Sequence, residues 1–246
     1  MKDKVIGILG GMGPEATIDL FSSIIAESNA KNDHEHLRII IDNNPKMPSR
    51  QDAILNGGEN PGPVMAETAR NIEHAGADFI IIGANTAHYF YDYVKEAVDI
   101  PVLHIIDEAV LETIRTVDKV KKVGVLATAG AMKTKMYENS FNKFDIEVVE
   151  VPNEIQELVH NSIFSFKYDG LNNENEEMMI KAANYLIDNG AEALVMGCTE
   201  IPLVLGNKKL SVKIINPNDV ITRISVKYAK NLIQVEKVEG RYLSII

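Results

Sequence analysis

The stretch that decides the fold is residues 188–200, which read DNGAEALVMGCTE. Its centre, 193–196, is a short apolar run between turn residues, which is typical of a buried strand. A similar stretch lies 114 residues earlier, at residues 74–86, and reads HAGADFIIIGANT. Because the glycines and the apolar run recur at one offset, the sequence predicts a chain built from two related halves.

A second pair of segments supports the repeat. Residues 6–10 read IGILG and residues 123–127 read VGVLA, and each run leads into a turn. Strands and helical stretches alternate along the chain. We expect strands at 5–9, 38–41, 78–82, 100–106, 123–126, 146–151, 193–196 and 212–215, and helices at 15–27, 64–75, 155–166, 176–189 and 219–234.

This alternation predicts an α/β fold with two pseudo-symmetric domains, each a parallel sheet flanked by helices. Ligands bind such sheets near the carboxyl ends of the strands. The expected domains are residues 1–99 together with 211–246, and residues 100–210. A pseudo-twofold axis between the halves would bring matched strand ends face to face, so the expected active site is the interdomain cleft.

The composition points to a small-molecule partner. The chain of 246 residues carries a formal net charge of −10, which argues against a nucleic-acid surface. No apolar run is long enough to cross a bilayer. The first strand begins too early to leave room for a secretory signal, and one cysteine excludes an intrachain disulfide. We therefore expect a cytoplasmic protein that binds neither nucleic acid nor membrane.

The single cysteine, Cys198, follows the strand 193–196 where the chain turns towards a helix. Thr199 and Glu200 come next, so a hydroxyl, a carboxylate and backbone N–H groups lie near the thiol and can stabilise a thiolate. The alternative is a buried cysteine that acts as a small hydrophobic residue. In the repeat, the counterpart of Cys198 is Ala84.

The segment 43–50, NNPKMPSR, follows the second strand and is stiffened by two prolines. Arg50 on this loop can hold a carboxylate with two parallel hydrogen bonds, and the alternative is a solvated surface arginine. The glycine-rich turn 10–14, GGMGP, opens a further alternative. Residues 11–16 match the dinucleotide-binding pattern with alanine in its last place, which would indicate a nucleotide site.

The rest of the sequence shows no metal or cofactor signature. The six histidines are scattered, and none lies in a helical pair with a carboxylate between them. His88, His104 and His160 are therefore interpreted as hydrogen-bonded scaffold residues. No phosphate-binding loop with lysine, serine nucleophile elbow or pyridoxal lysine signature is apparent. We expect the chemistry to come from Cys198 and its neighbours, without metal or cofactor.

Four motifs together resemble the aspartate/glutamate racemase family, and the aspartate racemase branch most of all. They are GGMGP (10–14), NNPKMPSR (43–50), NTAH (85–88) and GCTEIP (197–202). The resemblance covers nearly the whole chain and implies a cofactor-independent racemase that usually forms a homodimer. In that family each domain supplies one cysteine, and the two act on opposite faces of the substrate α-carbon. Cys198 matches the second cysteine, and Ala84 stands where the first belongs.

Two thiols are needed because inversion removes a proton from one face of a carbon and returns one to the other face. Thiol and thiolate interchange near neutral pH, from a reference pKa of about 8.5, and a helix N-terminus favours the thiolate. Ala84 cannot take part, so we expect a form that is inactive as a racemase. A substitution made to trap a ligand explains Ala84 better than natural drift.

The resemblance implies that Arg50 and Lys167 bind the side-chain carboxylate of aspartate. Met12 and Gly13, in the glycine-rich motif, are also expected to contact the substrate. Donors to the α-carboxylate, which stabilise the carbanion, are expected at strand-to-helix turns and are Asn85, Thr86, Thr128 and Thr199. The expected reaction is the interconversion of L- and D-aspartate.

Two alternatives from other classes stay open. One is a one-cysteine decarboxylase or isomerase of the same superfold, such as an arylmalonate decarboxylase, which needs a thiol on one side only. Such enzymes favour an apolar pocket, so Arg50 and Lys167 argue against this alternative. The other is a non-catalytic protein that binds an acidic amino acid and keeps a vestigial thiol.

Overall fold

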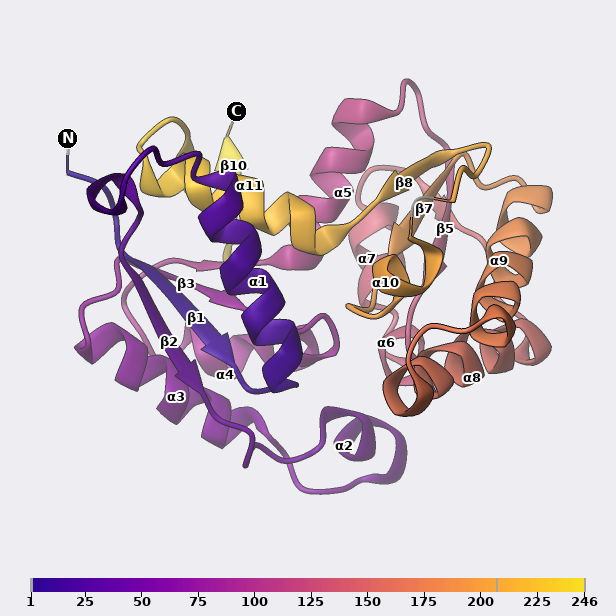
Figure 1. Cartoon of the computed structure of the whole chain (residues 1–246), viewed down its shortest axis with the longest axis horizontal. Coiled ribbons are helices and arrows are strands. Elements are labelled where there is room, and N and C mark those ends of the chain that lie inside the picture. The colour runs from indigo at the N-terminus through magenta and orange to yellow at the C-terminus, as the bar shows by residue number, and fades with distance from the viewer. Residues whose placement is uncertain (1, 207, 246) are drawn as a thin grey trace. The chain divides into compact units, whose positions relative to one another are not determined.

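The computed structural model describes residues 2–206 and 208–245. The chain divides into two compact units: in Figure 1 unit 1 is coloured indigo to magenta and, at its C-terminal part, yellow, and unit 2 is coloured magenta to orange. Unit 1 comprises the residues up to Glu108 and those from Asn218 onwards, and unit 2 comprises Ala109–Pro217. Both boundaries lie a little later in the chain than the ones predicted after residues 99 and 210.

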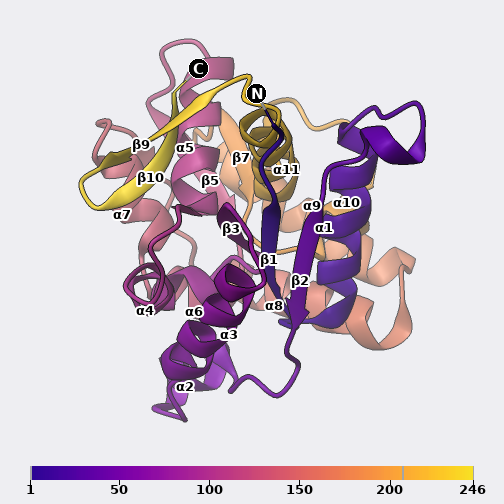
Figure 2. The same ribbon diagram turned by 90° about the vertical axis from the view of Figure 1, so that its left-hand side faces the viewer.

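Unit 1 is built on a six-stranded sheet with the strand order β2-β1-β3-β4-β10-β9. The strands are β1 (Ile6–Gly10), β2 (Ile39–Asn43), β3 (Phe79–Ile82), β4 (Val102–Leu103), β9 (Gln234–Val238) and β10 (Arg241–Ile245). Neighbouring strands from β2 to β10 pair in parallel, and β9 is antiparallel to β10. Figure 2 shows α1 (Pro14–Glu27) and α3 (Gly62–His74) on opposite sides of β1. Because helices cover both faces, β1 and β3 are buried along their whole length.

Unit 2 is built on a four-stranded parallel sheet with the strand order β6-β5-β7-β8. The strands are β5 (Lys122–Leu126), β6 (Glu147–Val148), β7 (Ala193–Met196) and β8 (Lys213–Ile215). Helix α9 (Asn173–Asp188) packs on β5 and β7, and α8 (Asn153–Asp169) packs on α9. Side chains of these two helices and of β7 form one continuous apolar core.

Further helices complete the two units. They are η1 (Asp33–Glu35), α2 (Arg50–Asn56), η2 (Thr86–Phe90), α4 (Tyr91–Lys95), α5 (Ile105–Thr116), α6 (Ala129–Lys133), α7 (Met136–Asn142), α10 (Ile201–Leu205) and α11 (Pro217–Ala229). Local sequence explains several helix starts: Pro14 occupies the first position of α1, and Ser49 and Thr128 cap α2 and α6 with their hydroxyl groups. Within the described residues, no helix is long and apolar enough to span a membrane.

The predicted repeat is present in the backbone. Strand β1 pairs with β3 so that Gly7 lies opposite Ile80, and β5 pairs with β7 so that Gly124 lies opposite Leu194. A Cβ atom at Gly7 would collide with the side chain of Ile72 in α3, and one at Gly124 would approach Leu194 Cδ2 to 2.5 Å. Both sheets therefore need a glycine where a helix and a neighbouring strand crowd the central strand.

Two strands lie in the sheet opposite to the one predicted. The prediction put the strand after residue 100 in the second domain, but β4 pairs with β3 in unit 1. It also put residues from 211 onwards in the first domain, but β8 pairs with β7 in unit 2. β4 is a two-residue apolar strand and β8 a three-residue edge strand, and such short segments fit either sheet, so the sequence pattern carries no information about which sheet they join.

The C-terminal segment also differs from the prediction. The last helix, α11, ends at Ala229, and the chain continues into the β9–β10 hairpin instead of remaining helical to residue 234. The hairpin makes the sheet of unit 1 mixed rather than purely parallel. Arg241 Nη1 donates to Asp107 Oδ2 over 2.8 Å, and Ser244 Oγ donates to Glu108 Oε2 over 2.6 Å. These contacts tie the hairpin, in which half of the strand residues are polar, to helix α5.

Candidate active site

The carboxyl edge of the unit 2 sheet carries the thiol. Gly197 N donates a hydrogen bond of 2.7 Å to Leu126 O, so the turn after β7 lies beside the end of β5. This places Cys198 and Thr128 at the same edge of the sheet. The Thr128 hydroxyl accepts a hydrogen bond from Ala131 N over 3.3 Å and caps α6.

Four polar side chains meet at this edge. Glu200 Oε2 accepts hydrogen bonds from Cys198 Sγ over 2.8 Å and from Thr199 Oγ1 over 2.9 Å. The other oxygen of the same carboxylate, Oε1, lies 3.0 Å from Lys167 Nζ, which comes from the last turn of α8. The structure thus brings together three predicted site residues through Glu200, which was named only as a neighbour of the thiol.

The protonation state of Cys198 differs from the prediction. Burial raises the pKa of the thiol well above its usual range, and the adjacent Glu200 carboxylate raises it further. The predicted help from a helix N-terminus is weak, because α10 is only one short turn of five residues. Cys198 therefore rests as a thiol and not as a thiolate.

Cys198 combines the two interpretations of its sequence position. The residue is 9% exposed and belongs to the apolar core of unit 2. Its sulfur nevertheless has a charged hydrogen-bond partner in Glu200. The ring of Tyr137 lies beside the preceding residue: Tyr137 Cε2 is 3.0 Å from where a Cβ atom on Gly197 would lie. The thiol is thus neither a simple core residue nor openly exposed.

The carboxyl edge of the unit 1 sheet repeats this arrangement without sulfur. Gly83 N donates to Leu9 O over 3.0 Å, which is the counterpart of the bond between Gly197 and Leu126. Ala84 and Asn85 are buried. Thr86 is half-buried and begins the short helix η2. Ala84 therefore occupies in unit 1 the place that Cys198 occupies in unit 2.

His88 braces the backbone at position 84, which fits its predicted scaffold role. Ile105 N donates to His88 Nε2 over 3.3 Å, so the ring proton is on Nδ1, which donates to Ala84 O over 2.9 Å. Burial lowers the pKa of His88 to about 4. The imidazole is therefore neutral near pH 7.

The glycine-rich turn lies against the loop that follows β2. Gly11 has φ +90°, and a Cβ atom there would collide with the backbone of Asn44. Gly11 N donates to Thr17 Oγ1 over 2.9 Å, so this N–H does not face outwards to bind a phosphate. Met12 is buried, whereas Gly13 is exposed.

Arg50 lies at a helix start and not within the loop. It is the first residue of α2, directly after the capping residue Ser49. Its Nη1 donates to Pro48 O over 3.1 Å, which leaves the guanidinium half-buried and held in one direction. Burial lowers the pKa of Arg50 from its usual value, but a guanidinium stays charged in proteins. Arg50 is thus only partly exposed to solvent, and its binding of a carboxylate stays a prediction.

The comparison with known families decides the assignment. Residues 9–224 match the family model of the Asp/Glu/hydantoin racemases. The chain belongs to this racemase family. Family membership agrees with the four motifs, which lie at the strand ends just described, and with the two α/β units.

Relatives of this racemase family member share its length and fold. The broad specificity amino-acid racemase RacX of Bacillus subtilis is 25% identical over 226 residues, which cover 90% of this chain and 96% of RacX. The aspartate racemase of Picrophilus torridus superimposes with a TM-score of 0.80 at 26% identity, over 92% of this chain and 94% of that one. An aspartate racemase homologue from Pyrococcus horikoshii gives a TM-score of 0.77 at 28% identity, over 92% and 99% of the two chains.

The predicted site residues of this racemase family member fall into two groups, one in each unit. Met12, Gly13, Arg50, Ala84, Asn85 and Thr86 follow β1, β2 and β3 in unit 1. Thr128, Lys167, Cys198 and Thr199 belong to unit 2, where all but Lys167 follow β5 or β7. Glu200 and His88 were missing from the predicted site, although Glu200 directly follows the Cys-Thr pair and His88 ends the NTAH motif.

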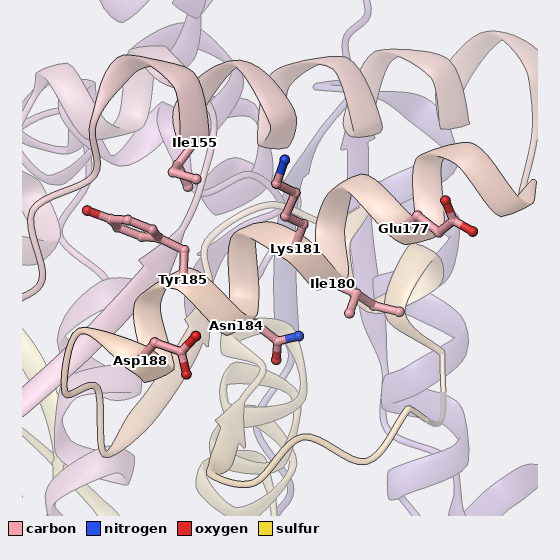
Figure 3. Close-up of a pocket in the computed structure, with 7 residues that line it drawn as sticks. All are labelled: Ile155, Glu177, Ile180, Lys181, Asn184, Tyr185 and Asp188. Carbon is pink, nitrogen blue, oxygen red and sulfur yellow. The ribbon is translucent and has the colours of Figure 1, made fainter.

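Two surface hollows lie in unit 2, and neither is lined by Cys198. One of about 460 Å³ is lined by side chains of α9 together with Ile155 of α8, as Figure 3 shows. The other, of about 720 Å³, is lined by α6, α7 and β6 and includes Tyr137 and Gln156. Neither is lined by a predicted substrate-binding residue. Within the described residues, no group of three or more histidine, cysteine or acidic side chains could hold a metal ion.

Proposed function

We propose that this chain acts on an acidic amino acid, aspartate in the first place, through proton transfer at the α-carbon by Cys198. The observation that carries the proposal is the equivalence of positions 84 and 198, which follow matched strands in the two halves of an amino-acid racemase fold. Matched positions in a pseudo-symmetric pair are suited to serve opposite faces of one carbon atom.

The chemistry explains why this chain is expected to lack racemase activity. A racemase without a cofactor needs a base on one face of the α-carbon and an acid on the other. Cys198 can provide one of these groups, because its sulfur carries a proton and has a carboxylate partner. Ala84 has no group that exchanges protons. Inversion should therefore be almost absent, while one-sided exchange remains possible.

The basic residues support an acidic substrate. Arg50 has a fixed guanidinium in unit 1, and Lys167 has its ammonium beside the thiol cluster in unit 2. Both are proposed to bind the side-chain carboxylate. Met12, Gly13, Asn85, Thr86, Thr128 and Thr199 remain proposed contacts of the substrate, most of them as donors to the α-carboxylate.

The direct test measures hydrogen exchange and inversion separately. The protein is incubated with L- or D-aspartate in D₂O, proton NMR follows loss of the α-hydrogen, and chiral chromatography follows inversion. Slow exchange of one enantiomer without inversion is expected, and Cys198→Ala should abolish it. Rapid inversion by the unmodified chain would contradict the requirement for two thiols. Failure of millimolar aspartate or glutamate to raise the melting temperature would contradict an acidic amino-acid ligand.

A one-cysteine decarboxylase is the second candidate, and the resting state of Cys198 favours it. A thiol with a raised pKa is suited to protonate a carbanion once, which is all that a decarboxylation requires. The charged groups Arg50 and Lys167 argue against its apolar substrates. Release of CO₂ from a phenylmalonate decides between the candidates, because rapid release would replace the racemase proposal.

Some predictions about the whole protein remain open to experiment. A homodimer is tested by light scattering of the purified protein, and a cytoplasmic location by cell fractionation. A non-catalytic binding protein would bind aspartate but exchange no α-hydrogen in either enantiomer, and Cys198→Ala would then leave the binding affinity unchanged.

A further inference from the structure

The carboxylate of Glu200 lies between the only thiol of the chain and a lysine ammonium. Its Oε2 accepts hydrogen bonds from Cys198 Sγ and Thr199 Oγ1, at 2.8 and 2.9 Å. Its Oε1 is 3.0 Å from Lys167 Nζ. Each oxygen has its own donors, so the carboxylate has a defined orientation towards the sulfur.

The Glu200 side chain does not stabilise helix α10, which begins directly after it. The main-chain carbonyl of Glu200 accepts the hydrogen bonds from Leu203 N and Val204 N that begin α10. The side chain makes no capping hydrogen bond to that helix. Its carboxylate, which is mostly buried, thus makes its hydrogen bonds to the thiol, the adjacent hydroxyl and the lysine.

We propose that Glu200 is a positioning residue for the thiol chemistry: its carboxylate holds the Cys198 S–H bond as the proton donor, and Lys167 holds the carboxylate. This role, which rests on the proposed function, assigns Cys198 the acid half of the reaction in the resting protein. Its counterpart on the other face would have to start as the base, and that is the group that Ala84 lacks.

The Glu200 carboxylate also affects the basicity of the thiolate that forms when Cys198 gives up its proton. When Cys198 protonates a carbanion, the S–H bond breaks, a C–H bond forms at the α-carbon, and the thiolate remains beside Glu200. Like charges within hydrogen-bond distance disfavour each other, so this thiolate is a stronger base than an isolated one. In the reverse step the C–H bond breaks, the thiolate recovers the proton and the carbanion forms again.

The electrostatics of the cluster agree with this geometry. Burial opposes ionisation of Glu200, but the hydrogen bond from Cys198 and the charge of Lys167 more than offset it and lower the pKa of Glu200. Tyr137, whose ring lies beside Gly197, has a pKa raised by burial and stays a neutral phenol. Of the described residues in unit 2, Glu200 and Lys167 are therefore the charged groups that act on the thiol.

The test uses the fact that the chain has one cysteine, so every thiol signal belongs to Cys198. The infrared S–H stretching band and the thiolate absorbance at 240 nm are recorded against pH, with Cys198→Ala as the blank for the tyrosines. Removing the charge in Glu200→Gln should move the S–H band to higher wavenumber. It should also shift thiol ionisation to lower pH by at least one unit, a tenfold gain in thiolate at a fixed pH.

Matched variants separate this effect from general damage. Glu176→Gln breaks another ion pair of unit 2, between Glu176 and Lys208 at 2.7 Å, and should change neither signal. Lys167→Met removes the opposing charge and should lower the thiolate fraction at least threefold at fixed pH. Glu200→Asp should restore part of the wild-type titration. An unchanged titration in folded Glu200→Gln, or in Lys167→Met if the first variant fails to fold, would overturn the proposal.

These measurements contain no substrate, so they stand apart from the test of the proposed function. A shifted titration in a protein that binds no acidic amino acid would retain Glu200 as the positioning residue and reject aspartate as the ligand. Aspartate binding with an unshifted titration would retain the substrate and reject the role of Glu200.

Discussion

His88 Nδ1 donates a hydrogen bond of 2.9 Å to the carbonyl oxygen of Ala84. The bond fixes the backbone at position 84 through a buried, neutral ring, whereas the Ala84 side chain takes no part in it. A larger side chain at position 84 would therefore leave the hydrogen bond between His88 and the Ala84 carbonyl in place. This makes position 84 a suitable place to restore a missing group.

Ala84→Cys should convert the chain into an active racemase. The new thiol would stand on the strand end equivalent to that of Cys198 and supply the base that Ala84 lacks. Chiral chromatography should then show interconversion of L- and D-aspartate in both directions. The double variant Ala84→Cys with Cys198→Ala serves as the control and should not invert the substrate. Failure of folded Ala84→Cys to invert aspartate or glutamate would contradict the proposal that positions 84 and 198 act as a catalytic pair.

Arg50→Ala should weaken aspartate binding by roughly 1.5–3 kcal/mol, the range for hydrogen bonds to a charged group. The guanidinium is held by Pro48 O and is available as a planar donor to a carboxylate. Titration calorimetry measures the change. Arg38→Ala is the matched control, because Arg38 is an exposed arginine that precedes β2, at the opposite end of that strand. Equal affinities in both variants would show that Arg50 does not bind the substrate.

His88 should make unit 1 less stable in mild acid. Its pKa is about 4 in the folded protein, below the ordinary 6.5, so the unfolded chain binds the extra proton between these values. Stability is then lost as pH falls through this window, by about 2 kcal/mol between pH 7 and pH 5.

Urea denaturation at the two pH values measures this loss. His88→Gln should reduce the difference, because the variant has no imidazole to protonate. His74→Gln is the control, since His74 is exposed and its imidazole meets solvent in both states. An identical pH dependence in His88→Gln and in the unmodified protein would contradict a buried neutral imidazole.

Gly7→Ala and Gly124→Ala should each destabilise the sheet to which they belong by about 1–3 kcal/mol, the usual cost of overpacking. The added methyl group at Gly124 would lie 2.9 Å from Leu186 Cβ, and the one at Gly7 would meet Ile72 in the equivalent helix. Gly83→Ala is the control, because its methyl group would find its nearest neighbour, Leu9 O, at 3.6 Å. Thermal unfolding should therefore separate the first two variants from the third.

The alternation of strands and helices was predictable because periodicity and turn residues act within a short stretch of chain. The strand predicted at 193–196 has the same bounds as β7, and the helix predicted at 15–27 appears as α1, Pro14–Glu27. The strand predicted at 146–151 is confined to Glu147–Val148 at the sheet edge. The hairpin β9–β10 escaped prediction because half of its strand residues are polar and its side chains bond to distant partners in α5.

The sequence by itself determined the two related halves, the racemase motifs and the position of Cys198 at a strand end, since these follow from local order and internal repetition. Only the tertiary structure decided which sheet β4 and β8 join, because both strands are short and their pairing partners come from other parts of the chain. It also decided the state of the thiol. Lys167 and Glu200 are far apart in sequence, and only the folded chain brings their side chains together. Burial and the charge of Glu200 raise the pKa of Cys198 and keep it a thiol, whereas its sequence neighbours suggested a thiolate.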